Sequence, residues 1–128
     1  MTTDVYKIVL IDDDEDDNYL HRTCIESIEN AKVVGEFCRA REALTWFQQG
    51  PRNVDIIFLD INMPEMNGFE FLEKYYELDK SLHAKMLVFL LTSSLLDVDR
   101  QRAVSLGAKL GAKPLTREKF VQLVEKLE

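Results

Sequence analysis

The sequence predicts an α/β protein built on one doubly wound parallel sheet, and three observations support this prediction. The chain has 128 residues, enough for a single domain with a full hydrophobic core. Short apolar runs without alternation recur along it, as expected of strands buried on both faces of a parallel sheet. Stretches with helical spacing of apolar residues separate these runs, so strands and helices alternate, with right-handed crossovers between them.

The first apolar run, residues 6–11, predicts a buried strand, and acidic residues follow it without a break. Residues 14–17 are assigned to a solvated helix start, where carboxylates interact favourably with the helix dipole. Asp12 and Asp13 lie at the strand tip itself, so we treat them as candidate site residues. Apolar residues at four-residue spacing predict the helix over residues 16–29. They are Leu20, Cys24 and Ile28.

A weaker second strand and a second helix come next. Residues 32–37 predict the strand, and residues 40–49 predict a helix that ends at Gly50 and Pro51. The apolar face of this helix is expected to contain Ala43, Leu44 and Phe47. We interpret Trp46 as a packing residue.

The third apolar run, residues 56–59, is short and rich in β-branched and aromatic residues, as in a central strand. It ends at Asp60, and a cluster of turn-forming residues follows, namely Asn62, Pro64, Asn67 and Gly68. The carboxyl end of a central strand faces the crevice in which open α/β sheets bind ligands, which makes Asp60 the first candidate for chemistry. An Asp in this position is more often a turn or cap residue, so Asp60 alone decides nothing.

The second half of the chain continues the alternation. A helix is predicted over residues 68–78, a strand over 85–91, a helix over 96–106, a short strand over 109–112 and a last helix over 117–127. The inward residues expected in the first and last of these helices are Phe69, Leu72, Tyr75 or Tyr76, Phe120, Leu123, Val124 and Leu127. The complete order is therefore (βα)5.

Polar residues also follow the last two strands. Thr92, Ser93 and Ser94 come after the fourth strand, where hydroxyl residues commonly cap a helix. Lys113 and Pro114 come after the fifth strand. A lone Lys is usually a solvated charge, and a Pro after a strand marks a tight turn that is sometimes cis. Each residue has such an ordinary explanation, but parallel strands bring their tips to one crevice.

Five side chains from four strand tips therefore meet in this fold: Asp12, Asp13, Asp60, Thr92 and Lys113. Crowded carboxylates repel one another unless a cation lies between them, and oxygen ligands select a hard cation such as Mg²⁺. We expect Asp13, Asp60 and the backbone carbonyl of Asn62 to be direct ligands. Asp12 is expected to act through water.

The same charges predict a reaction. The metal ion and Lys113 would neutralise an incoming phosphoryl group, whose charge lies on its peripheral oxygens. Asp60 is then expected to attack phosphorus and form an acyl phosphate. The Thr92 hydroxyl is expected to hydrogen-bond a phosphoryl oxygen after the transfer.

Four motifs along the chain resemble those of the receiver domains of bacterial two-component response regulators. They are IDD at residues 11–13, FLDINMPEMNG at 58–68, LTSS at 91–94 and GAKP at 111–114. The resemblance implies one receiver domain over residues 1–128, without an output domain, and the flavodoxin-like strand order 2-1-3-4-5. It also implies that Asp60 is the phosphoacceptor and that Thr92 and Lys113 are switch residues. A sensor histidine kinase or a histidine phosphotransfer protein is the implied donor.

The resemblance departs at Leu110, where receivers usually carry an aromatic residue that swings inward as the Thr moves. This departure affects the coupling of Thr92 to the surface and leaves the phosphorylation site intact. The output surface is expected on the fourth helix, the fifth strand and the fifth helix, where a protein target or a second copy in a weak homodimer would bind. Its basic residues are Arg100, Arg102, Lys109, Arg117 and Lys119. Solvated charge is an equally good interpretation of each.

Composition argues against several functions. Lys and Arg number 16 against 23 Asp and Glu, giving a formal net charge of −7, which argues against binding to nucleic acid or to an anionic membrane. The chain shows neither a targeting signal nor an apolar run of membrane-spanning length, so we expect a cytoplasmic protein. Cys24 and Cys38 lack metal-site spacing and are expected to be free thiols. His21 and His83 do not lie at strand tips and are assigned to the surface or to packing.

Two other functions stay open. A Mg²⁺-dependent phosphohydrolase with an Asp nucleophile usually needs a second acid two residues after the nucleophile, and Asn62 occupies that position. A degenerate receiver that binds partners without phosphorylation is compatible with Leu110, whereas the retained Asp60 and Lys113 argue against it. We therefore expect no enzyme activity beyond the domain's own phosphotransfer and dephosphorylation.

Overall fold

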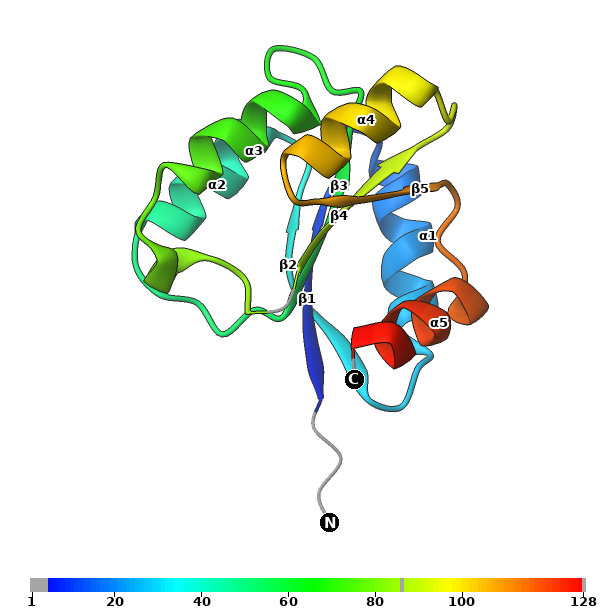
Figure 1. Cartoon of the computed structure of the whole chain (residues 1–128). Helices are drawn as coiled ribbons and strands as arrows, with labels where there is room; N and C mark the ends of the chain where they lie inside the picture. The colour runs from blue at the N-terminus through cyan, green and yellow to red at the C-terminus, as the bar shows by residue number, and fades with distance from the viewer. Residues whose placement is uncertain (1–4, 86, 128) are drawn as a thin grey trace.

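A computed structural model describes residues 5–85 and 87–127, with the side chain of Leu127 outside the description (Figure 1). Five parallel strands form one sheet in the order β2-β1-β3-β4-β5, which confirms the predicted fold class and strand order. The strands are β1 (Tyr6–Ile11), β2 (Ala31–Phe37), β3 (Ile56–Asp60), β4 (Leu87–Thr92) and β5 (Lys109–Ala112). Residues 1–4, part of the stretch for which we expected no targeting signal, lie outside the described residues, as does Met86 of the predicted fourth strand.

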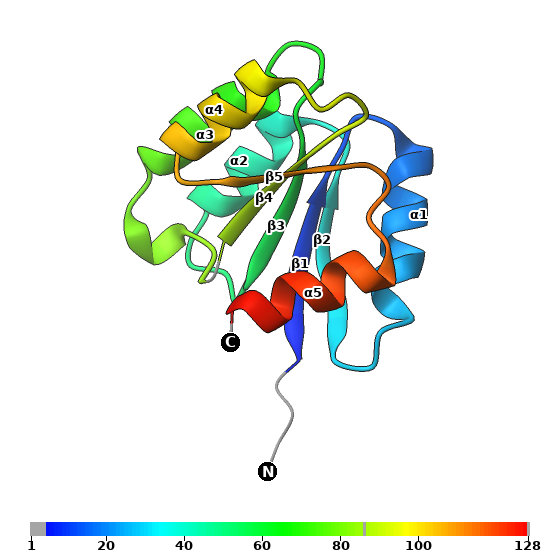
Figure 2. The same cartoon turned by 45° about the vertical axis from the view of Figure 1, so that its right-hand side comes forward.

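Helices cover both faces of this sheet. They are α1 (Glu15–Glu26), α2 (Ala40–Gln48), α3 (Gly68–Tyr76), α4 (Asp97–Ser105) and α5 (Arg117–Leu127). Figures 1 and 2 show α1 and α5 on one face and α2, α3 and α4 on the other. Right-handed crossovers produce this division when the strand order changes direction between β1 and β3.

Both faces of the central strands are buried. In β1, Ile8 and Leu10 pack in the layer of α1 and α5, whereas Val9 and Ile11 pack in the layer of α2, α3 and α4. Every residue of β3 is buried. Successive strand residues point to opposite faces, so a strand covered on both sides needs an unbroken apolar run. The burial thus confirms the pattern from which the sheet was predicted.

Element boundaries agree with the sequence pattern within two residues, except in the first helix. Helix α1 ends at Glu26, and the N–H of the C-cap residue Ser27 donates to the carbonyls of Thr23 and Cys24 at 3.2 and 3.3 Å. A 3₁₀ turn, η1 (Lys80–Leu82), is not predicted by the pattern, and the Asp79 side chain caps it. Tyr75 rather than Tyr76 is the inward residue of α3, with exposed fractions of 1% and 39%.

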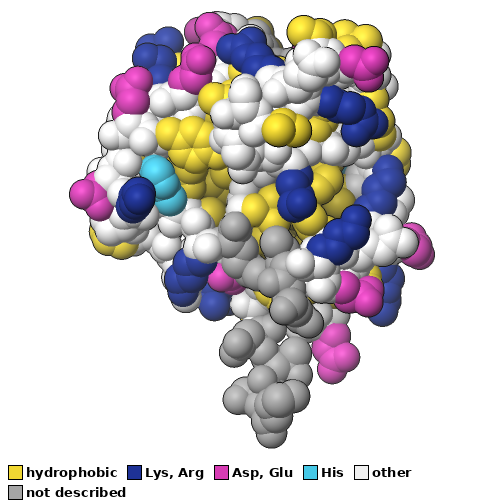
Figure 3. All heavy atoms as spheres, viewed as in Figure 1, with side chains coloured by type: hydrophobic (Ala, Val, Ile, Leu, Met, Phe, Trp, Pro, Cys, Tyr) yellow, Lys and Arg dark blue, Asp and Glu magenta, His cyan; other side chains and the backbone are white. Residues whose placement is uncertain are grey.

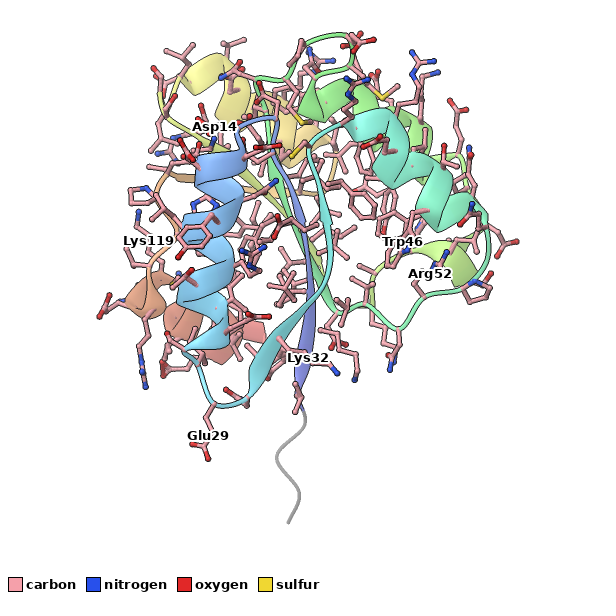
Figure 4. The ribbon with its side chains drawn as sticks, turned by 180° about the vertical axis from the view of Figure 1, so that it is seen from behind. Asp14, Glu29, Lys32, Trp46, Arg52 and Lys119 are labelled. Carbon is pink, nitrogen blue, oxygen red and sulfur yellow. The ribbon has the colours of Figure 1, made fainter. Side chains whose placement is uncertain are left out.

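The residues that the sequence assigned to packing or left without a role behave as expected. Trp46 packs against Phe37, and the Arg52 guanidinium carbon lies 4.3 Å from the centre of its ring (Figure 4). Cys24 and Cys38 are free thiols. Among the described residues, no helix combines the length and the apolar character that a bilayer crossing requires.

Candidate functional site

The candidate site lies at the carboxyl edge of the sheet, where the loop after β3 folds back against its own strand. The Gly68 N–H donates to the Ile61 carbonyl at 2.8 Å. A Cβ atom on Gly68 would lie 2.7 Å from the Asp60 carbonyl oxygen, so this close approach requires glycine. The Asn62 N–H donates to Asp60 Oδ1 at 3.3 Å. The loop therefore holds the backbone and the carboxylate of Asp60 together.

Three of the predicted residues form an acidic cluster. Asp12, Asp13 and Asp60 each contribute one carboxylate oxygen, and these oxygens lie within 4.8 Å of one another. Asp12 and Asp60 are buried, whereas Asp13 is exposed. The Asp14 N–H donates to Asp12 Oδ1 at 3.0 Å, which orients that carboxylate. The cluster therefore has a buried floor and one side open to solvent.

Lys113 supplies the cation of the site. Its ammonium nitrogen lies within ion-pair distance of three carboxylates: Asp12 Oδ2 at 2.7 Å, Asp17 Oδ2 at 2.8 Å and Asp60 Oδ1 at 3.3 Å. The backbone N–H of Lys113 donates to the Thr92 carbonyl at 2.8 Å, so the tip of β4 fixes the base of the lysine side chain. The tips of β1, β3 and β5 thus meet at one point.

Burial and mutual repulsion disfavour the ionised form of the clustered carboxylates. Burial, reinforced by the charge of Asp12, raises the pKa of Asp60 to about 7. Burial also raises the pKa of Asp12, against the opposing effect of Lys113. Burial alone would lower the pKa of Lys113, but hydrogen bonds to Asp12 and Asp17 raise it above its ordinary value. The ammonium therefore stays charged, and one lysine does not balance the cluster.

The donor set fits a hard divalent cation. The cluster consists of carboxylates alone, which are the ligands that Mg²⁺ and Ca²⁺ prefer. Burial, with the added charge of Asp12, raises the pKa of Asp60, and a divalent cation beside it would favour the ionised carboxylate. Asn62 is exposed beside the cluster, and the role of its carbonyl as a further ligand stays a prediction.

Thr92 lies at the tip of β4 and is fully buried. Its Oγ1 donates to the Ser94 carbonyl at 3.0 Å and accepts from the Ser94 N–H at 3.1 Å. A Thr hydroxyl carries one proton, so donation to any other oxygen requires release of the Ser94 carbonyl. Leu110 of β5 pairs with Leu90 of β4, and its half-buried side chain packs against the layer of α2, α3 and α4.

Two residues of α1 reach the site without having been predicted there. Asp17 lies in the first turn of α1, as expected, but it is only partly solvated because it also forms an ion pair with Lys113. Spacing along the sequence gave no signal for this contact, because its two partners are 96 residues apart. His21 is a buried packing residue, as expected, and its Nε2 accepts from the Leu115 N–H at 3.3 Å. Burial lowers the pKa of His21, which favours the neutral form that this hydrogen bond needs.

Comparison with known proteins adds a family match to this geometry. The family model described as "Response regulator receiver domain" matches residues 8–125. Over 120 residues the chain is 30% identical to an uncharacterized 14.6 kDa protein of Leptolyngbya boryana, covering 92% of this chain and 86% of that protein. Several other curated relatives are much longer. The chain spans 20% of a protein-glutamate methylesterase/protein-glutamine glutaminase of Agrobacterium fabrum and 9% of the Probable histidine kinase 2 of Oryza sativa.

Solved structures have the same fold. A two component response regulator from Cytophaga hutchinsonii superposes with a TM-score of 0.85 at 28% identity, and the match covers 98% of each chain. CheY6 from R. sphaeroides, solved in complex with the P1 domain of CheA3, superposes with a TM-score of 0.74 at 29% identity and 98% coverage of both chains. The described fold and the sequence match therefore point to the same family.

Proposed function

This chain belongs to the response regulator receiver domain family, and from that membership we propose that it accepts a phosphoryl group on the Asp60 carboxylate. The observation that supports this proposal is the position of Asp60, buried at the tip of β3 between two further carboxylates and the Lys113 ammonium. In the proposed step an Asp60 oxygen bonds to phosphorus. The bond from phosphorus to the imidazole nitrogen of a phosphohistidine breaks, and that nitrogen leaves with the electron pair.

The residues around Asp60 take distinct roles in this proposal. The Lys113 ammonium turns toward a phosphoryl oxygen, where it balances charge that the transfer places on the site. The Thr92 hydroxyl breaks its hydrogen bond to the Ser94 carbonyl and donates instead to a phosphoryl oxygen that Lys113 does not contact. Release of this carbonyl alters the loop between β4 and α4, so phosphorylation changes the surface beside it.

A Mg²⁺ ion is part of the proposal. Asp13, Asp60 and the Asn62 carbonyl would hold it directly, and Asp12 through water. When bound, the ion would supply positive charge between the carboxylates and the phosphoryl oxygens. The buried Asp12 and Asp60 keep the donor oxygens in place before any ion arrives.

The proposed donor is a sensor histidine kinase or a histidine phosphotransfer protein in the cytoplasm, and the proposed target is a protein. The face formed by α4, β5 and α5 is the proposed output surface, for a target or for a second copy of the chain. Figure 3 shows apolar side chains on this face with Lys and Arg side chains around them. A groove of about 740 Å³ lies there, and its basic lining residues are Arg100, Lys109, Lys119 and Lys126.

Arg100, Lys109 and Lys119 are among the five basic contacts expected from the sequence. The other two, Arg102 and Arg117, do not line the groove. The Arg102 guanidinium carbon lies 4.5 Å from the centre of the Phe69 ring, and the guanidinium is 3.9 Å from Glu73. Arg102 therefore faces α3, on the other side of α4 from the groove. Removal of Arg102 is expected to affect packing more than target binding.

The test is mass spectrometry after incubation with acetyl phosphate and Mg²⁺. We expect one added phosphoryl group on the wild-type protein, none on Asp60→Asn, and one on the exposed control Asp97→Asn. A label that persists in Asp60→Asn would show that another residue is the acceptor. An unlabelled wild-type protein would favour a degenerate receiver that only binds partners. Continuous release of phosphate in many turnovers would favour the phosphohydrolase alternative.

A further inference from the structure

Asp17 forms a contact that its place in an acidic run does not explain. Its Oδ2 accepts a hydrogen bond from the Lys113 ammonium at 2.8 Å, across 96 residues of sequence. Figures 1 and 2 show why the two meet, since the connection from β5 to α5 passes beside α1. The second contact between these elements, from the Leu115 N–H to His21 Nε2, keeps α1 and this connection together.

Three carboxylates lie within ion-pair distance of the Lys113 ammonium, and among the described residues the contact with Asp17 is the one with hydrogen-bond geometry. A lysine ammonium donates three hydrogen bonds, and Asp12, Asp17 and Asp60 lie at 2.7, 2.8 and 3.3 Å from its nitrogen. The contact with Asp60 is the longest of the three. The ammonium is therefore held toward Asp12 and Asp17, away from the carboxylate that the proposed reaction uses.

Asp17 is the partner that the ammonium can leave most easily. The side chains of Asp12 and Asp60 are 4% and 5% exposed, whereas that of Asp17 is 32% exposed. A carboxylate that loses its ion pair must be solvated, and water reaches only Asp17 readily. A new anion on Asp60 would therefore displace Asp17 rather than Asp12 from Lys113.

We propose that Asp17 is a positioning residue that holds Lys113 back from the phosphoacceptor and competes with the phosphoryl group for its ammonium. This inference rests on the proposed function of Asp60. Loss of the Asp17 carboxylate removes an ion pair with Lys113 from the unmodified protein. It removes no ion pair from the phosphorylated state, because there the phosphoryl group has already displaced Asp17 from Lys113. The Asp17→Asn substitution therefore shifts the balance toward the phosphorylated state, by about twofold to fivefold for a partly exposed ion pair.

The experiment measures the binding of beryllium trifluoride, a stable mimic of the phosphoryl group, by isothermal titration calorimetry at saturating Mg²⁺. We expect Asp17→Asn to bind the mimic about twofold to fivefold more tightly than the wild type. The matched control is Asp16→Asn, which removes the same charge from the same helix. Asp16 is exposed, and no ion pair among the described residues involves it. Asp17→Glu should return the affinity toward that of the wild type.

Salt separates the direct contact from a general effect of charge. At about 1 M salt the screening length falls to about 3 Å, so a field acting through solvent largely disappears while a partly buried pair is screened much less. The difference between Asp17→Asn and Asp16→Asn should therefore persist at high salt. The proposal is overturned if the two variants bind alike at high salt, if Asp17→Asn binds no more tightly than the wild type, or if Asp17→Glu behaves as Asp17→Asn.

The outcome also distinguishes this inference from the proposed function. If the wild-type protein neither binds beryllium trifluoride nor takes a label from acetyl phosphate, the proposed function is contradicted, and the inference about Asp17 falls with it. If the wild-type protein does both, but Asp17→Asn and Asp16→Asn have the same affinity for beryllium trifluoride, the proposed function stands and only the role of Asp17 is contradicted. Melting temperatures of all variants identify any substitution that damages the fold.

Discussion

Asp60 and Asp13 carry the same functional group at neighbouring strand tips, but their surroundings give them different properties. Asp60 is 4% exposed, and burial together with the charge of Asp12 raises its pKa to about 7. Asp13 is exposed and lies at the open side of the cluster. The buried carboxylate is thus suited to chemistry that needs a low-dielectric site, and the exposed one to contact with an ion arriving from solvent.

The raised pKa of Asp60 predicts how the stability of the metal-free protein depends on pH. A carboxyl whose pKa is higher in the folded than in the unfolded state binds protons more tightly when folded. Its contribution is therefore fully present below pH about 4 and is lost as the pH rises toward about 7. We expect the free energy of unfolding of the wild type to fall relative to that of Asp60→Asn across this range, as measured by urea titration.

Mg²⁺ provides the control for this pH dependence. A bound divalent cation stabilises the ionised form of Asp60, so the difference between the wild type and Asp60→Asn should shrink when saturating Mg²⁺ is present. Comparison with the variant also cancels the opposite contribution of His21, whose lowered pKa adds stability as the pH rises. A difference that does not change with pH would contradict the burial of an uncompensated charge at Asp60.

The loop between β3 and α3 is the element that shapes the site. Its helix begins with a capping box, in which the Asn67 side chain accepts from the Glu70 N–H at 2.9 Å and the Glu70 carboxylate accepts from the Asn67 N–H at 3.0 Å. Gly68 then lies against the backbone of Asp60. The start of α3 and the tip of β3 are therefore one rigid unit, and the geometry of Asp60 depends on both.

Gly68→Ala tests this unit. The new Cβ would lie 2.7 Å from the Asp60 carbonyl oxygen and 3.0 Å from Ile61 Cα, and neither backbone atom can move without shifting the strand tip. We expect a loss of about 1–3 kcal/mol in the free energy of unfolding, measured by urea titration. Gly35→Ala is the matched control, because its Cβ would meet only side-chain atoms, the nearest at 3.2 Å. An equal loss in both variants would contradict the special role of the Gly68 contact.

At the scale of the whole molecule, charge is unevenly distributed. The chain has a formal net charge of −7; a cluster of carboxylates lies at the strand tips, and basic residues line the groove beside α4, β5 and α5. The acidic edge would favour a cation, and the basic groove would favour an acidic partner surface, as the proposed function requires. Two surfaces of opposite charge therefore lie on one small domain, and Thr92 lies between them on β4.

Mg²⁺ is expected to stabilise the whole fold, because it binds the native carboxylate cluster and not the unfolded chain. At an ion concentration ten times its dissociation constant, the gain is about 1.4 kcal/mol, which raises the melting temperature by about 5 °C for a chain of this size. Calorimetry with and without Mg²⁺ measures this shift. Asp13→Asn should abolish it, whereas the exposed control Asp97→Asn should keep it. An unchanged melting temperature in the wild type would argue against the metal site.

The amino-acid sequence was sufficient to predict the layers, the strands and four of the side chains that meet in the site. Unbroken apolar runs determine which strands are covered on both faces, and a strand that ends in a polar residue places that residue at the edge of the sheet. For this reason the sequence alone predicted that four side chains lie close together, namely Asp12, Asp13, Asp60 and Lys113. The strand order came from the resemblance to receivers, and the structure confirms it.

Only the tertiary structure decided which partners these side chains have. The contact of Asp17 with Lys113 joins a helix near one end of the chain to a strand near the other, and local periodicity carries no information about such a distance. The space left around Leu110 likewise depends on how neighbouring elements pack. Patterns along a chain encode which residues are buried, whereas the distances between distant residues follow from packing of the complete fold.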